Sequence, residues 1–180
     1  MRKTHKKMKR TEQEKEVKAV LDQLGMDYEE QFPIMLGDVA GGPGVRLEDG
    51  VNWIVVDFLV RLKQKHCSEI VAGSKNNGNQ QDVVIKCARL TLGSGRKRLM
   101  MRIRQRAHDL ELRFFEIKRH YGGVICIALM EAPQYGVAAY IRPRMPDADI
   151  VVDSVDSLKD ELIRLENRIE EVCRRSLASR

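Results

Sequence analysis

The chain has little of what marks a membrane or secreted protein. Its 180 residues contain no apolar run approaching the roughly 20 residues that a bilayer-spanning helix needs. The first ten residues are basic and no apolar segment follows them, so no signal peptide is predicted. The four cysteines are scattered, with no Cys-x-x-Cys pair, which argues against a zinc site or a disulfide framework. These absences predict an intracellular protein of the reducing cytoplasm, with no membrane partner.

The composition is that of a globular protein with an excess of positive charge. Hydrophobic residues make up 43% of the chain, which is enough for a packed core. The formal net charge is +6, and six of the first ten residues are Lys or Arg. We therefore expect a basic, disordered arm (1–10), an α/β domain (11–150) and a C-terminal segment (151–180) that forms a helix. The positive excess favours a polyanionic partner.

Hydrophobic periodicity predicts the order helix, three strands, helix, two strands, helix. A capping box between Thr11 and Glu14 begins the first helix, and Gly25 ends it. The other predicted elements are strands at 28–36, 51–62, 82–90, 124–130 and 135–141, helices at 96–121 and 156–175, a loop or hairpin tip at 37–50 and a long loop at 63–81. This order predicts an α/β fold with a mixed central sheet flanked by helices.

The last predicted helix carries an apolar seam. Its members are four and three residues apart in alternation: Leu158, Leu162, Leu165, Ile169 and Val172. Such spacing is typical of a coiled-coil contact over little more than two heptads. The helix is expected either to pack on the sheet of its own chain or to form a homodimer through residues 158–172.

Two charged residues stand inside apolar strands. Asp57 lies in the middle of the segment 51–60, and Lys86 lies in the segment 82–90. A buried ionised carboxylate is costly unless it is paired or binds a metal. Asp57 and Lys86 therefore indicate either a site where a metal ion and a phosphate meet or a buried salt bridge.

These residues resemble the PD-(D/E)XK nuclease superfamily, especially its small single-domain members related to very-short-patch repair endonucleases. The resemblance covers roughly residues 11–132 and rests on three matches: Glu14 in a first helix, the run Tyr28-x-x-Gln31-x-Pro33-Ile34, and Val56-Asp57-Phe58. It implies a restriction-endonuclease-like αβββαβ core followed by a C-terminal helix. It also implies hydrolysis of a DNA phosphodiester that depends on Mg²⁺ or Mn²⁺, as in DNA repair.

The resemblance assigns a role to each acidic or basic residue of the site. It implies that Asp57 binds the metal, that Glu14 and Asp82 assist, and that Lys86 lies near the scissile phosphate. The third strand departs from the family pattern, because it has Lys86 and Ala88 where a Glu and a Lys are typical. An ammonium group in the metal position repels a divalent cation, so metal binding is expected to be weak or absent if Lys86 occupies it.

The helix at 96–121 begins with a candidate phosphate-binding segment. Glycines allow close backbone approach, and free N–H groups at a helix start attract anions. The residues expected to bind the DNA backbone are Gly93, Ser94, Gly95, Arg96, Lys97, Arg98, Arg102 and Arg106. The other interpretation is a solvated cationic face that acidic residues further along the helix balance.

The sequence hypothesis is a Mg²⁺-dependent endonuclease that acts on duplex or branched DNA. The departure at Lys86 and Ala88 leaves three explanations open: a dead site, an enzyme inactivated by substitution, or catalytic groups supplied instead by Glu14, Asp82 or Lys97. The first alternative is a catalytically dead DNA-binding or scaffold protein with the same fold. The second is an interaction module that assembles through residues 158–172 and binds no nucleic acid.

Overall fold

The computed structural model describes residues 11–37, 45–48, 51–63, 80–90, 96–132 and 137–178. Their elements are α1 (Glu12–Gln23), β1 (Asp27–Gly37), β2 (Val45–Glu48), β3 (Val51–Lys63), β4 (Gln80–Arg89), α2 (Arg96–Tyr121), β5 (Ile125–Glu131), α3 (Val137–Ile141), a 3-10 turn η1 (Arg142–Arg144), β6 (Ile150–Val152) and α4 (Val155–Ala178). None of the helices described is long and apolar enough to cross a bilayer.

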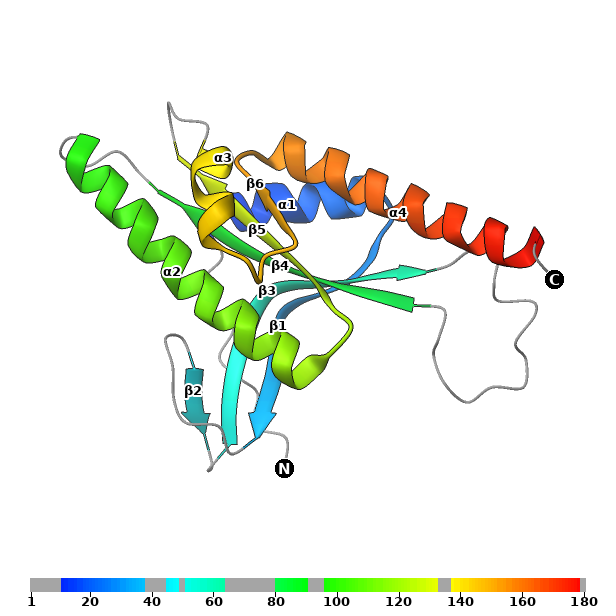
Figure 1. Cartoon of the computed structure of the whole chain (residues 1–180), viewed down its shortest axis with the longest axis horizontal. Helices are drawn as coiled ribbons and strands as arrows, with labels where there is room; N and C mark the ends of the chain where they lie inside the picture. The colour runs from blue at the N-terminus through cyan, green and yellow to red at the C-terminus, as the bar shows by residue number, and fades with distance from the viewer. Residues whose placement is uncertain are drawn as a thin grey trace.

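The strands form one mixed sheet in the order β1-β3-β4-β5-β6, and β2 pairs with β3. The pairs β1–β3, β2–β3 and β3–β4 are antiparallel, whereas β4–β5 and β5–β6 are parallel. The long helix α2 is the crossover between the parallel strands β4 and β5, as parallel pairing requires. Figure 1 shows the twisted sheet with helices on both faces, so the predicted α/β fold with a mixed sheet flanked by helices is confirmed.

One predicted strand is wrong, and the structure adds two short strands that were not predicted. The prediction of a strand at 135–141 is wrong, because Val137–Ile141 is the helix α3. Val137 and Ile141 are both buried, and their four-residue spacing suits a helix. The second parallel strand is β6 instead, whose three residues are too few to show alternation. The segment 37–50 contains the short strand β2.

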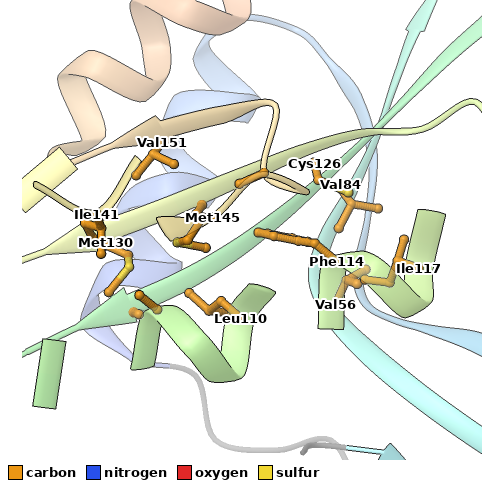
Figure 2. Close-up of a cluster of buried hydrophobic side chains, with 14 of the residues drawn as sticks. Val56, Val84, Leu110, Phe114, Ile117, Cys126, Met130, Ile141, Met145 and Val151 are labelled. Atoms are coloured by element: carbon orange, nitrogen blue, oxygen red, sulfur yellow. The ribbon is translucent and has the colours of Figure 1, made fainter. Parts of the chain in front are cut away.

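Two hydrophobic cores lie on opposite faces of the sheet. The first packs α2 and α3 on the sheet, and Figure 2 shows Phe114 and Ile117 of α2 near Val56 of β3, with Met130 of β5 near Ile141 of α3 in the same core. The second core packs α1 and α4 on the other face. Each face of the sheet is therefore covered, which explains why β5 is almost continuously apolar.

The apolar seam of α4 contributes to the second core. Leu158 and Leu162 are fully buried, Leu165 is 7% exposed, and Ile169 packs against the same cluster. Residues of α1 belong to the same cluster. A homodimer through these leucines would have to displace this packing within the chain. The side chain of Val172 lies outside the described residues.

Strand β3 changes the face that its side chains contact at Asp57. Val56 and Phe58 are two residues apart, a spacing that normally keeps side chains on one face of a sheet. Val56 nevertheless belongs to the first core and Phe58 to the second. Gln31 of the adjacent strand β1 has a φ of 51°, a left-handed conformation that is rare for residues other than glycine. Asp57 therefore lies at the distorted position of β3, next to Phe58, where the pairing of β3 with β4 ends.

Candidate nucleic-acid-binding site

The site forms where β3 and β4 separate. Their pairing runs from Lys63↔Gln80 to Phe58↔Ile85 and ends there. The next residues along the two strands are Asp57 and Lys86. Beyond this point β4 stays paired with β5, whereas β3 curves away toward β2 (Figure 1). Among the described residues, no strand pairs with this part of β4 on the side that β3 leaves.

A pocket of ≈ 710 Å³ occupies this opening. Residues of α1, β1, β3, β4 and α2 line it. The lining includes Glu14, Gln31, Asp57, Lys86, Arg102 and Arg106. Four of these residues, Glu14, Gln31, Asp57 and Lys86, are ones that the resemblance identifies. The structure places them in the same pocket as two arginines of the predicted basic helix, Arg102 and Arg106.

A hydrogen-bonded ion pair forms the floor of the pocket. Lys86 Nζ lies 2.7 Å from Asp57 Oδ1 and also donates to the carbonyl oxygen of Val55 at 3.1 Å. The second carboxylate oxygen, Oδ2, accepts the backbone N–H of Cys87 at 2.6 Å. The side chains of Lys86 and Asp57 are only 7% and 9% exposed. Of the two interpretations that the sequence left open, the buried salt bridge is the one observed.

The residues of this pocket do not fit a divalent cation. Among the described residues there is no group of three or more His, Cys, Asp or Glu side chains that could hold a metal ion. Both oxygens of Asp57 already accept hydrogen bonds, and one of them contacts an ammonium group. A cation at that oxygen would have to displace Lys86 or be repelled by it. We therefore derive no catalytic step through Mg²⁺ or Mn²⁺ for this chain.

Glu14 is held at the rim of the pocket by the capping box of α1. The Glu14 N–H donates to Thr11 Oγ1, and the Thr11 N–H donates to Glu14 Oε2, both at 3.2 Å. Burial and the negative charge of Asp57 raise the pKa of the Glu14 carboxyl. The predicted capping box is thus confirmed, and it orients an acid toward the Asp57–Lys86 pair.

The structure does not bring Asp82 to the site. Asp82 lies four residues before Lys86 on β4, on the part of the strand that is still paired with β3. It accepts a hydrogen bond from the Tyr121 hydroxyl at 2.8 Å and is not part of the pocket lining. Burial and this bond to Asp82 raise the pKa of Tyr121 to about 12.

One flank of α2 presents arginines to the pocket. Arg102 and Arg106 are four residues apart, which is about 6 Å along a helix. Neither makes an ion pair or hydrogen bond within the part of the chain that the structure describes. Arg98 is exposed one turn earlier. Residues 93–95 and the side chains of Arg96 and Lys97 lie outside the described residues, so their predicted phosphate contacts stay predictions.

Arg113 also lines the pocket, although the sequence argument did not single it out. Its position seven residues after Arg106 places it on the same flank of α2, so helical spacing was a usable signal. With Arg113, five cationic side chains and three acidic ones line the pocket: Lys86, Arg89, Arg102, Arg106 and Arg113 against Glu14, Asp57 and Asp109. The pocket therefore has an excess of positive charge.

Arg89 and Asp109 are both engaged within the protein. Arg89 forms ion pairs with Glu16 of α1 and Glu131 of β5, each at 2.7 Å. Asp109 accepts a hydrogen bond from Gln105 on the same helix at 3.0 Å. The positive charge that is available to a ligand consequently comes from Arg102 and Arg106 of α2 rather than from β4.

Comparison of the chain with protein-family models, with curated proteins and with solved structures finds no match in any of the three. The resemblance to PD-(D/E)XK nucleases thus stays a prediction. Function has to be argued from the chemistry of the pocket, because a fold alone does not specify an activity.

Proposed function

We propose that the protein binds the phosphate backbone of DNA in this pocket and needs no divalent cation to do so. The observation that carries the proposal is the arrangement of Lys86, buried against Asp57, below the unpartnered arginines Arg102 and Arg106. In this proposal the protein is a nuclease-like DNA-binding protein without metal-dependent hydrolysis. This was the first alternative to the endonuclease hypothesis.

The arginines support a phosphate ligand. A guanidinium group presents its N–H donors in a planar fork that matches phosphate oxygens, and such charge-assisted bonds are among the strongest in proteins. Successive arginines on one flank of α2 follow a line, as consecutive phosphates of a DNA strand do. Contacts of this kind give affinity without reading the base sequence.

Lys86 supports binding without a metal. In the family that the chain resembles, a cation offsets the negative charge of the acids and of the bound phosphate. In this chain the ammonium of Lys86, 2.7 Å from Asp57, offsets the carboxylate from within the protein. Lys86 therefore acts as an internal cation that takes the place of the metal. One copy of the chain is sufficient for this arrangement.

The metal-dependent endonuclease stays the second candidate because Glu14 and Asp57 line the same pocket. For that activity the chain lacks the second acid expected at position 86 and the lysine expected at position 88, where it has Lys86 and Ala88. The double variant Lys86→Glu/Ala88→Lys restores both family residues at positions that already line the pocket.

Supercoiled plasmid incubated with Mg²⁺ or Mn²⁺ separates the two candidates. We expect the natural chain to bind the plasmid without nicking it, and the double variant to nick it. The single variant Lys86→Glu is the intermediate control, since it gains the acid but not the lysine. Metal-dependent nicking by the natural chain would overturn the proposal. Failure of the natural chain to bind at low salt would favour an interaction module instead.

A further inference from the structure

Lys86 is positioned as a nucleophile at the floor of the pocket. An ammonium group has three N–H donors, and those of Lys86 have two acceptors, Asp57 Oδ1 and the Val55 carbonyl oxygen. The residue is 5% exposed, yet it lines the pocket. Its nitrogen is thus held in one place by two bonds, and the side chain lines the pocket.

A proton acceptor for this nitrogen is already in contact with it. A lysine attacks a carbonyl carbon only as the neutral amine, so its proton must first go to a base. The Asp57 carboxylate lies 2.7 Å away. A second carboxylate, that of Glu14, lines the same pocket.

The other lining residues restrict the class of carbonyl compound. Arg102 and Arg106 at the wall favour a ligand that carries an anionic group such as phosphate. We propose that Lys86 forms a Schiff base with the aldehyde of a phosphate-bearing sugar, namely the ring-opened deoxyribose of an abasic site in DNA. This inference rests on the proposed DNA binding and adds a metal-independent strand cleavage at damaged sites.

The reaction balances with water as its only co-reactant. Asp57 takes a proton from Lys86, the amine adds to the C1′ aldehyde carbon, and Asp57 returns the proton as water leaves to give the protonated imine. Glu14 then removes a proton from C2′. The electron pair of the C2′–H bond forms the C2′–C3′ double bond. The C3′–O bond breaks, and the phosphate leaves on the 5′ end of the downstream strand. Glu14 then gives its proton to water. Hydrolysis of the imine restores Lys86.

Borohydride reduction tests this step, because it converts the imine into a stable secondary amine. The full chain is incubated with a duplex that contains one abasic site, in EDTA, and then reduced. We expect a covalent protein–DNA adduct that peptide mapping assigns to Lys86. The adduct is expected to fall to background in Lys86→Arg, which keeps the charge but forms no imine. It should persist in Lys118→Arg, a lysine paired with Asp149 at 2.9 Å and not part of the pocket lining.

Peptide mapping of the natural chain keeps the test valid even if Lys86→Arg does not fold. An adduct at another lysine, or no adduct on an abasic duplex that the chain demonstrably binds, overturns the inference and leaves the proposed DNA binding intact. Absence of binding to both intact and abasic duplexes overturns the proposed function and this inference together. The binding titration, run beside the trapping reaction, distinguishes these two failures.

Discussion

Replacing Lys86 with methionine is expected to lower the free energy of unfolding by about 3–5 kcal/mol. The substitution keeps the length of the side chain but removes the ammonium, so the Asp57 carboxylate stays buried with the Cys87 N–H as its remaining donor among the described residues. A buried charge without its partner is among the most destabilising defects that a single substitution can make. Urea denaturation followed by circular dichroism measures the change.

The chain contains a matched control for this substitution. Asp149 accepts Lys118 Nζ on one oxygen and the Cys126 backbone N–H on the other, as Asp57 does with Lys86 and the N–H of Cys87. That pair is 29% and 39% exposed, so solvent screens it. We expect Lys118→Met to cost about 1 kcal/mol or less.

A second control tests whether the uncompensated charge is the cause. The double variant Asp57→Asn/Lys86→Met removes both charges and is expected to recover part of the stability that Lys86→Met loses. If Lys86→Met costs no more than Lys118→Met, the pair does not stabilise the diverging ends of β3 and β4, and our description of the pocket floor is wrong.

Reversing the charge of Arg102 and Arg106 together, to glutamate, is expected to weaken binding to duplex DNA by more than about 100-fold, since each of the two lost charge-assisted hydrogen bonds contributes about 1.5–3 kcal/mol. The slope of log K against log salt concentration should also become shallower by about 2, because each lost phosphate contact reduces the magnitude of this slope by about 0.9. Fluorescence anisotropy at several salt concentrations measures both quantities.

The matched control is the double variant Arg119→Glu/Arg164→Glu. It changes the net charge by the same amount, but its residues are exposed and are not part of the pocket lining. We expect it to alter affinity much less and to leave the slope nearly unchanged. Equal losses in the two double variants would mean that net charge, and not the pocket, is responsible for binding.

The charged residues at the floor of the site could be predicted from the sequence, because each is a charged residue among apolar neighbours in the same strand. A single acid or a single lysine within an apolar strand stands out, and Asp57 and Lys86 were each identified in this way. The bounds of α2 were predicted for a similar reason, since glycines flank a long 3.6-residue pattern that the structure reproduces at Arg96–Tyr121.

The shape of the pocket could not be predicted in the same way. Strands are predicted on the assumption that residues two apart face the same side of the sheet. This alternation fails in β3, because Val56 and Phe58 contact the cores on opposite faces. The divergence of β3 and β4 follows from this local distortion and from the left-handed backbone of Gln31. The resemblance assigns Asp82 to the site, but three residues of paired strand separate it from Lys86.

The most direct test of the central claim is a titration of the natural chain into duplex DNA, in EDTA and in Mg²⁺ at matched ionic strength. An internal cation at Lys86 predicts equal dissociation constants in the two buffers and a linear fall of log K with log salt concentration. Binding that appears only with Mg²⁺, or that does not respond to salt, would contradict the claim that Lys86 and the arginines of α2 replace a metal at this site.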